Sequence, residues 1–201
     1  MSGNPVSSLY LLYLTVIIMD DKFKSKYRIE STRLTGWDYG STSLYYITIC
    51  TKDKVRYFGE IVSFKDEDLQ EDTQLDPSAI GMVAFANWIS IPDHFPFVEL
   101  DEFVIMPNHM HGIIFINRPD KFNWEPNKFG VQSQNLGSVI RGYKASVKTF
   151  ATINDIEFNW QPRYHDRVIR NEKEYLNIKN YIIGNPRQWL LNGDNEDYLF
   201  K

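Results

Sequence analysis

The amino-acid sequence predicts an α+β fold in which one antiparallel sheet carries helices on one face. Two observations lead to this fold class. Runs rich in β-branched and aromatic residues indicate strands, and these runs are Leu44–Thr51, Phe97–Met106 and His111–Ile116. Segments with helical spacing or helix-capping residues lie between and after the strands, namely Asp76–Ile91, Leu136–Thr152 and a last helix that begins at Asn171. With 201 residues, 43% of them hydrophobic and 24% charged, the chain suits one globular domain with a packed core.

The segment after the first strand is expected to turn back on it. Val55–Val62 is the expected hairpin partner, because only a polar turn at Lys52–Lys54 separates it from that strand. An acidic loop follows from Glu60 to Asp76, with seven acidic side chains against one lysine. Asp76 and Pro77 then provide an N-cap and a first-turn proline for the next helix.

The second half of the chain alternates loops with regular structure. Asp120–Gln134 is rich in Asn, Pro and Lys, which indicates a surface loop, and Asn159–Arg170 is expected to be a loop leading into a short strand. The last helix is expected to begin at Asn171 with Glu174 as its capping-box partner. It should end near Gly184–Pro186, because glycine and proline both stop helices.

The two ends of the chain are expected to lie outside the domain. We expect residues 1–30 to be an N-terminal extension, 31–190 the domain and 191–201 a tail. The apolar segment Leu9–Met19 is too short to span a membrane and lacks the flanking residues of a signal peptide. Met19 as the true first residue is the interpretation we favour; a buried strand or helix and a membrane-facing segment are the alternatives. We expect no stable membrane association and a cytoplasmic location.

Charge is distributed unevenly along the chain. The formal net charge of −4 and the pI of about 5.6 argue against a nonspecific nucleic-acid coat. Between Arg141 and Arg187, however, there are nine basic residues and five acidic ones. The acidic loop is therefore expected to mask the basic charge of the half of the chain that carries the function. The only cysteine, Cys50, permits no intramolecular disulfide and is compatible with a reducing cytoplasm.

His109 and His111 are the candidate metal ligands. Residues two apart on a strand share a face, so both imidazoles can point at one metal ion. The spacing alone is explained equally well by two histidines bonded to polar neighbours at the end of a strand.

Tyr181 and Asn185 are four residues apart in the last helix and therefore lie on one helical face. A phenol is a poor nucleophile unless it is activated, but it can reach a phosphodiester held against a metal. The amide oxygen of Asn185 can supply a hard ligand for Mg²⁺ or Mn²⁺. The structural alternative is that Tyr181 faces the core and Asn185 caps the helix before Pro186.

A basic stripe is the candidate DNA-backbone site. Arg141, Lys144 and Lys148 step by three and four along one expected helix, a spacing that suits phosphates but also describes an ordinary solvated face. A loop with aromatic and basic side chains precedes the last helix and can stack on bases or bind phosphates. Its candidate residues are Trp160, Arg163 and Arg170.

The order of these motifs resembles REP-associated tyrosine transposases, which belong to the HUH superfamily of single-strand nucleases and transposases. The matching stretches cover about Arg33 to Trp189 and read WDYGSTSLYYITICT, HFPFVELDEFVIMPNHMHGII, LGSVIRGYKASV, NWQPRYHDRVIRNEKEY and IKNYIIGNPRQW. Pro-Asn-His-x-His after a hydrophobic strand, followed by Tyr-Ile-x-x-Asn-Pro in a late helix, is a specific combination. One departure is Arg167, where many members of the family have histidine, so we assign Arg167 no catalytic role.

The resemblance implies a fold, a reaction and a partner. The fold would be a ferredoxin-like antiparallel sheet with the His-x-His strand at its centre. His109 and His111 would be the metal pair, Asn185 the third ligand and Tyr181 the single nucleophile, with Mg²⁺ or Mn²⁺ as cofactor. The partner would be single-stranded DNA with a palindromic hairpin, bound by a monomer or homodimer in the nucleoid.

The residue types then predict nicking and rejoining of a single strand through a 5′-phosphotyrosine link. The general base stays open, with His165 and Asp166 as possibilities beside purely structural roles for both. Two other functions remain: a domesticated DNA-binding module that does not cut, and a metal hydrolase that activates water while Tyr181 is structural.

Overall fold

The computed structural model describes residues 34, 36–64, 72–118 and 134–192. Its centre is a four-stranded sheet with the order β4-β5-β1-β6, in which every neighbouring pair is antiparallel. The strands are β1 (Ser43–Cys50), β4 (Val98–Met106), β5 (His109–Ile116) and β6 (His165–Ile169). The expectations for residues 1–30, for most of the loop at 120–134 and for most of the C-terminal tail lie outside the described residues.

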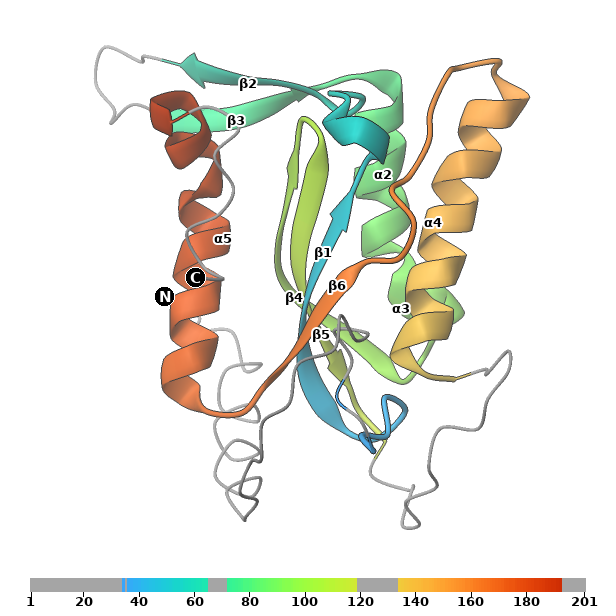
Figure 1. Cartoon of the computed structure of the whole chain (residues 1–201), viewed down its shortest axis with the longest axis vertical. Helices are drawn as coiled ribbons and strands as arrows, with labels where there is room; N and C mark the ends of the chain where they lie inside the picture. The colour runs from blue at the N-terminus through green and yellow to red at the C-terminus, as the bar shows by residue number, and fades with distance from the viewer. Residues whose placement is uncertain (1–33, 35, 65–71, 119–133, 193–201) are drawn as a thin grey trace.

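The order of elements along the chain gives the sheet a ferredoxin-like topology. β1 leads to α2 (Ala79–Ile89) and the short α3 (Ile91–His94), the β4–β5 hairpin leads to α4 (Leu136–Ile153), and β6 closes the second half (Figure 1). This β-α-β-β-α-β order with the first strand between the third and the fourth is the ferredoxin-like arrangement. The predicted fold class is therefore confirmed, with β5 and β1 as the central strands.

Helices cover both faces of the sheet, whereas we expected them on one. α2 and α4 lie against one face, and α5 (Glu172–Asn192) lies alone against the other (Figure 1). The reason is that both faces of β1 and β5 are apolar: Tyr45 and Ile47 point into the α2–α4 core, while Leu44 and Tyr46 point toward α5. A sheet whose central strands are apolar on both faces must be covered on both faces.

A second sheet replaces the expected hairpin partner of β1. β2 (Gly59–Phe64) pairs with β3 (Asp72–Pro77), so the segment after β1 forms a separate two-stranded arm, and part of the expected acidic loop is a strand. Gly59 is required in this arm, because it has a φ of 131° and a Cβ there would lie 2.1 Å from the carbonyl oxygen of Asp76. Between β1 and the arm lies the 3-10 helix η1 (Lys52–Lys54).

The helix termini differ from the expected ones in physically clear ways. Ser78, not Asp76, caps α2, because its hydroxyl accepts from the Gly81 N–H at 3.1 Å. α5 passes through Pro186 and reaches Asn192 instead of ending at Gly184. The turn after the proline is held by Trp189, which packs with Ile61 and Met106, and this packing outweighs the loss of one helical hydrogen bond. Among the described residues, no helix combines the length and apolar character that crossing a membrane requires.

Candidate active site

The candidate site lies on the face of the sheet that α5 covers, at the end where β5 begins. The strand registers pair Thr48 of β1 with His111 on one side and with His165 on the other, so these three side chains stand in one row. His109 begins β5 and pairs with Cys50, two positions nearer the strand end. The opposite face of β5 is closed by Trp88, whose ring leaves no space for a side chain at Gly112. The packing of Trp88 against Gly112 therefore holds β5 in place on the face opposite the histidines.

His109 and His111 meet as the two-residue spacing predicts. Their ring centroids are 4.6 Å apart and both side chains are buried. The Nδ1 of His109 lies 2.7 Å from the side-chain oxygen of Asn108, whose amide nitrogen donates to the Lys54 carbonyl. Because that oxygen can only accept, Nδ1 of His109 carries the proton and Nε2 keeps its lone pair. This is the tautomer that a metal-ligating histidine needs.

His111 is held by two hydroxyl groups of β1. Its Nδ1 lies 2.8 Å from the Tyr46 hydroxyl and 3.0 Å from the Thr48 hydroxyl, and its ring stacks on Tyr46. Burial lowers the pKa of His111 well below 6.5, and His109 and His165 lower it further. The imidazole is therefore neutral at pH 7, which is the protonation state in which histidine binds metal.

α5 brings Tyr181 to His111. The Tyr181 hydroxyl lies 3.4 Å from Nε2 of His111, and the two rings contact each other edge to face. Asn185 is 7% exposed, one helical turn beyond Tyr181. The structure thus places a phenol hydroxyl beside a neutral imidazole nitrogen, with a buried amide on the same helix. Tyr181 and Asn185 are one turn apart within α5 and so share one helical face.

A charged anchor that the sequence did not reveal fixes α5 to β4. The Asp101 carboxylate accepts from the Tyr175 hydroxyl at 2.6 Å and from the Lys179 ammonium at 2.9 Å. Burial alone would lower the pKa of Lys179, but the hydrogen bonds and charges of Asp101 and Tyr175 together outweigh it and the pKa is raised. Asp101 lies where the β4–β5 register shifts, between Leu100 and Phe103. Such a bulge turns a side chain out of the regular alternation, which is why strand periodicity did not indicate it.

The basic stripe on α4 serves mainly to hold the neighbouring loop. The Lys144 ammonium donates to the carbonyls of Gln161 and Arg163 at 2.7 and 2.8 Å, and the Lys148 ammonium donates to the Phe158 carbonyl at 2.6 Å. Burial lowers the pKa of Lys144. We predicted these lysines as phosphate ligands from spacing, but their ammonium groups are bonded to protein carbonyls. Arg141 is exposed on the same helix.

Trp160 is partly buried and packs against the core. Its indole N–H donates to the Lys144 carbonyl at 2.9 Å, and its ring contacts Phe58, Phe158 and Tyr143. These contacts cover part of the ring, and a role for Trp160 in stacking on bases stays a prediction. Arg163 and Arg170, the other two candidates in this segment, are exposed.

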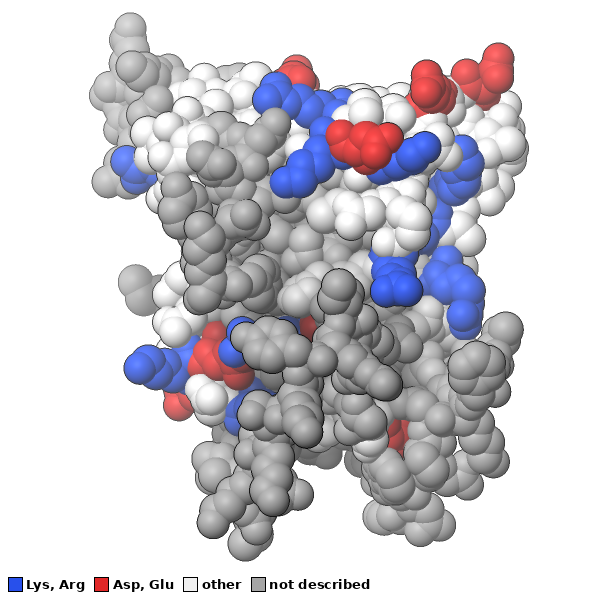
Figure 2. Space-filling model, in the orientation of Figure 1, with Lys and Arg blue, Asp and Glu red and all other residues white. Residues whose placement is uncertain are grey.

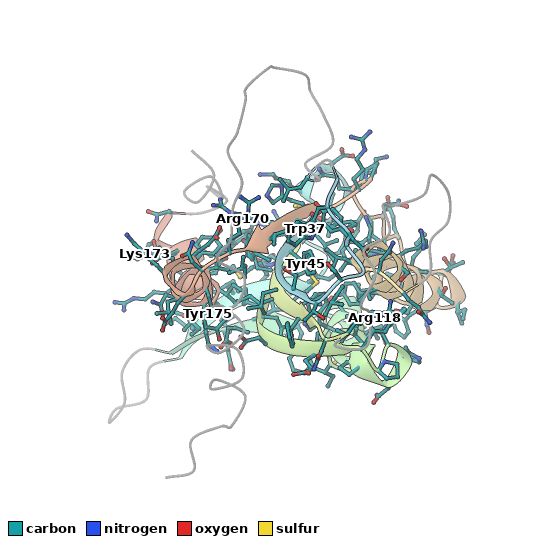
Figure 3. All side chains as sticks on the ribbon, turned by 90° about the horizontal axis from the view of Figure 1, so that it is seen from below. Trp37, Tyr45, Arg118, Arg170, Lys173 and Tyr175 are labelled. Carbon is teal, nitrogen blue, oxygen red and sulfur yellow. The ribbon has the colours of Figure 1, made fainter. Side chains whose placement is uncertain are left out.

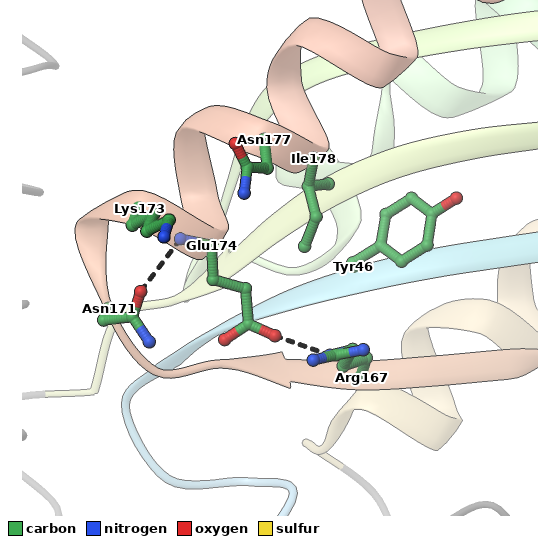
Figure 4. A pocket seen from close by; sticks show the side chains of 7 residues that line it. All are labelled: Tyr46, Arg167, Asn171, Lys173, Glu174, Asn177 and Ile178. Carbon is green, nitrogen blue, oxygen red and sulfur yellow. Dashed lines mark hydrogen bonds and ion pairs between the residues drawn. The ribbon is translucent and has the colours of Figure 1, made fainter. Parts of the chain in front are cut away.

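A pocket opens beside the site at the start of α5. It has a volume of about 340 Å³ and is lined by Tyr46, Arg167, Asn171, Lys173, Glu174, Asn177 and Ile178. Figure 4 shows the Glu174 carboxylate bonded to Arg167 and the Asn171 side chain bonded to the Glu174 backbone. Glu174 thus pairs with Arg167 instead of completing the expected capping box. Tyr46 links the pocket to the site, since its hydroxyl contacts His111.

The donor set fits a hard divalent ion. It consists of two buried, closely spaced imidazoles and one buried asparagine, which suits Mn²⁺ or Mg²⁺ with further oxygen ligands from water or substrate. Within the described ranges, no three His, Cys, Asp or Glu side chains come together so as to hold a metal ion. The candidate set contains two side chains of those types, His109 and His111, and Asn185 is the candidate third ligand.

Comparison with known proteins places the chain in a family. No protein-family model matches it. An uncharacterized protein of Haemophilus influenzae is 39% identical over 169 residues, which cover 80% of this chain and 89% of the relative. The chain belongs to the same family as this Haemophilus protein. Family membership assigns no activity here, so function is argued from the site.

The chain is also similar to a solved structure. A REP-associated tyrosine transposase bound to a REP hairpin matches 82% of this chain and 74% of its own, with a TM-score of 0.49 and 19% sequence identity.

Proposed function

We propose that the chain is a metal-dependent single-strand DNA endonuclease and strand-transfer enzyme with Tyr181 as its nucleophile. One observation supports this most: the Tyr181 hydroxyl lies 3.4 Å from Nε2 of His111, next to the ring of His109. A hydroxyl at a two-histidine metal site is placed to attack a substrate atom that the site also polarises. The motif order that resembles REP-associated tyrosine transposases supports the same reaction.

His109, His111 and Asn185 are the residues that would hold Mg²⁺ or Mn²⁺. Asn108, Tyr46 and Thr48 orient the two imidazoles, so the ligand geometry is set before any ion or substrate arrives. A bound divalent ion would supply Lewis-acid polarisation of a nonbridging phosphate oxygen and stabilise the charge that develops there.

Tyr181 carries out the bond exchange. Its phenol oxygen attacks phosphorus, forming a Tyr–O–P bond while the bond to the 3′ oxygen of the neighbouring nucleotide breaks. The proton lost by the phenol is balanced by the proton that the departing 3′ oxygen gains. The enzyme then holds a 5′-phosphotyrosine, and attack by a second 3′-OH reverses the exchange and joins two strands without an external energy source.

The proposed substrate is a palindromic, hairpin-forming DNA element with a flanking single strand, acted on by a monomer or homodimer at the nucleoid in the cytoplasm. Exposed Arg141, Arg163 and Arg170 would contact its backbone. Lys144 and Lys148 would act through the loop that they hold. In this proposal His165 and Asp166 are the two candidates for the base that receives the phenol proton.

Cleavage of hairpin-bearing single strands taken from the gene's own flanks tests the proposal. The wild type should cut in Mg²⁺ or Mn²⁺ and stop in excess chelator, and Tyr181→Phe should bind normally without cutting, since a phenyl ring preserves the packing. His109→Ala and His111→Ala should each abolish cleavage. Asn185→Ala should lose less activity, because both histidine ligands survive. Full activity in chelator would remove the metal, and wild-type cleavage by Tyr181→Phe would remove the nucleophile.

A further inference from the structure

Arg56 contacts the Trp189 ring, and this ring in turn contacts His109 of the candidate metal site. Its guanidinium carbon lies 5.4 Å from the centroid of the Trp189 ring, and the Trp189 ring centroid lies 6.0 Å from that of His109. Trp189 is only 8% exposed, whereas the Arg56 side chain is 46% exposed. A solvent-facing cation is thus seated on a buried ring that contacts a proposed ligand.

The segment that carries Arg56 is fastened to the turn before His109. The Thr51 hydroxyl oxygen lies 2.8 Å from the carbonyl oxygens of both Asn108 and Val55, which share its proton. The Asn108 side chain donates to the Lys54 carbonyl. Asn108 is also the residue that sets the tautomer of His109. The position of Arg56 and the orientation of the proposed ligand are therefore coupled through one asparagine.

Positive charge gathers around this segment. η1 carries Lys52 and Lys54, both exposed, just before Arg56. Figure 2 shows blue side chains at the upper centre of the molecule, where η1 lies in Figure 1. Arg56 forms an ion pair with Glu60 at 3.3 Å, and the Glu60 side chain is 61% exposed. An ion pair so exposed contributes little to stability, so a phosphate can replace Glu60 at a small cost in free energy.

We infer that Arg56 binds a backbone phosphate of the DNA strand next to the phosphodiester that reacts, and so positions the strand over His109 and His111. The inference rests on the proposed function and names where the strand runs beside that site. The planar guanidinium presents paired N–H donors that match phosphate oxygens, and stacking on Trp189 fixes its orientation before DNA binds. Such an orienting contact lies outside the set of residues predicted from the α4 stripe.

Arg118 provides a matched control at the other end of β5. Its guanidinium carbon lies 5.6 Å from the Phe97 ring centroid, so it too is an arginine over an aromatic ring. Figure 3 labels Arg118 toward α4, on the other side of the sheet from Lys173 and Tyr175 of α5. Replacing Arg118 removes the same charge and the same kind of stacking, but far from the start of β5.

The experiment measures affinity for a fluorescent single-strand hairpin DNA against salt concentration, in the Tyr181→Phe background so that no cleavage occurs. Arg56→Gln should lower the log–log salt slope by about 0.7, the amount for one phosphate contact on a single strand. Affinity should fall about two- to fivefold near physiological salt, as for one exposed charge contact. Arg118→Gln should leave both slope and affinity unchanged. Arg56→Lys should restore the slope, since a point charge also releases a counterion.

Thermal unfolding of each variant separates a DNA contact from loss of the fold. An Arg56→Gln protein that unfolds at the wild-type temperature but keeps the full slope and affinity would overturn the inference, as would an equal effect of Arg118→Gln. Cleavage by the protein with Tyr181 intact is scored separately. If no cleavage occurs but the Arg56 slope change is found, the phosphate contact stands and the proposed reaction fails. If cleavage occurs without a slope change, only the Arg56 contact fails.

Discussion

His111 contacts three other side chains of the candidate site through its two ring nitrogens. Its two nitrogens face different groups: Nδ1 faces the hydroxyls of Tyr46 and Thr48, and Nε2 faces the Tyr181 hydroxyl. The residue is buried, and burial lowers its pKa well below 6.5. A buried imidazole that cannot take a proton without cost keeps a lone pair available for a metal, and the same cost makes folding depend on pH.

The free energy of unfolding of the metal-free protein should fall as the pH is lowered below about 6.5, the pKa of an unperturbed histidine. In this range the unfolded chain binds the His111 proton and the folded chain does not, so acid favours unfolding. The loss should level off below the depressed folded pKa. Urea unfolding in chelator between pH 8 and 5 measures it. His111→Asn should flatten the dependence; an unchanged dependence in that variant would contradict the burial of a neutral imidazole.

The sequence predicted part of this residue environment. Strand alternation correctly placed His109 and His111 on one face, because that needs only the period of a single strand. It did not indicate Tyr46 and Thr48 as partners of His111, because those residues are 65 and 63 positions away along the chain and meet it only through the β1–β5 register. The stripe prediction on α4 had the correct spacing, but helical spacing carries no information on which carbonyls Lys144 and Lys148 reach.

α5 decides whether Tyr181 reaches the histidines, and two contacts set its position. Near its start, Asp101 of β4 binds Tyr175 and Lys179, and near its end Trp189 packs on Met106. The sequence predicted the start of this helix from its capping residues. Its length was not predicted, because Gly184 and Pro186 favour termination locally and only the tertiary packing of Trp189 carries the helix past them.

Asp101→Asn should lower the free energy of unfolding by about 1–3 kcal/mol, because it removes the charged acceptor of two hydrogen bonds at a carboxylate that is only 10% exposed. It should also slow cleavage more than it weakens DNA binding, since it loosens the helix that carries Tyr181. Glu102→Gln is the control: Glu102 lies 3.8 Å from Lys179 and is 35% exposed, so its loss should cost well under about 1 kcal/mol. Equal losses in the two variants would show that Asp101 is no special anchor.

At the scale of the whole molecule, the two faces of the sheet have different roles: one carries the core and the other carries the candidate site. One face is buried under α2 and α4 and contains most of the core, while the other face presents the histidines to α5 (Figure 1). An α+β class followed from the order of strands and helices, and the ferredoxin-like topology from the family resemblance. The β2–β3 arm and the second covered face were missed, because strand pairing between distant segments leaves no local mark on a sequence.

The central claim is that Tyr181 forms a covalent bond to DNA at a site built by His109 and His111. The most direct test incubates the protein with hairpin-bearing single-strand DNA and Mn²⁺ or Mg²⁺, digests it with a protease and identifies the DNA-linked peptide by mass spectrometry. We predict a 5′-phosphate linked to Tyr181, formed only with the metal and absent in Tyr181→Phe. A link to another residue, or cleavage that leaves free 5′-phosphate ends and no linked peptide, would contradict the claim.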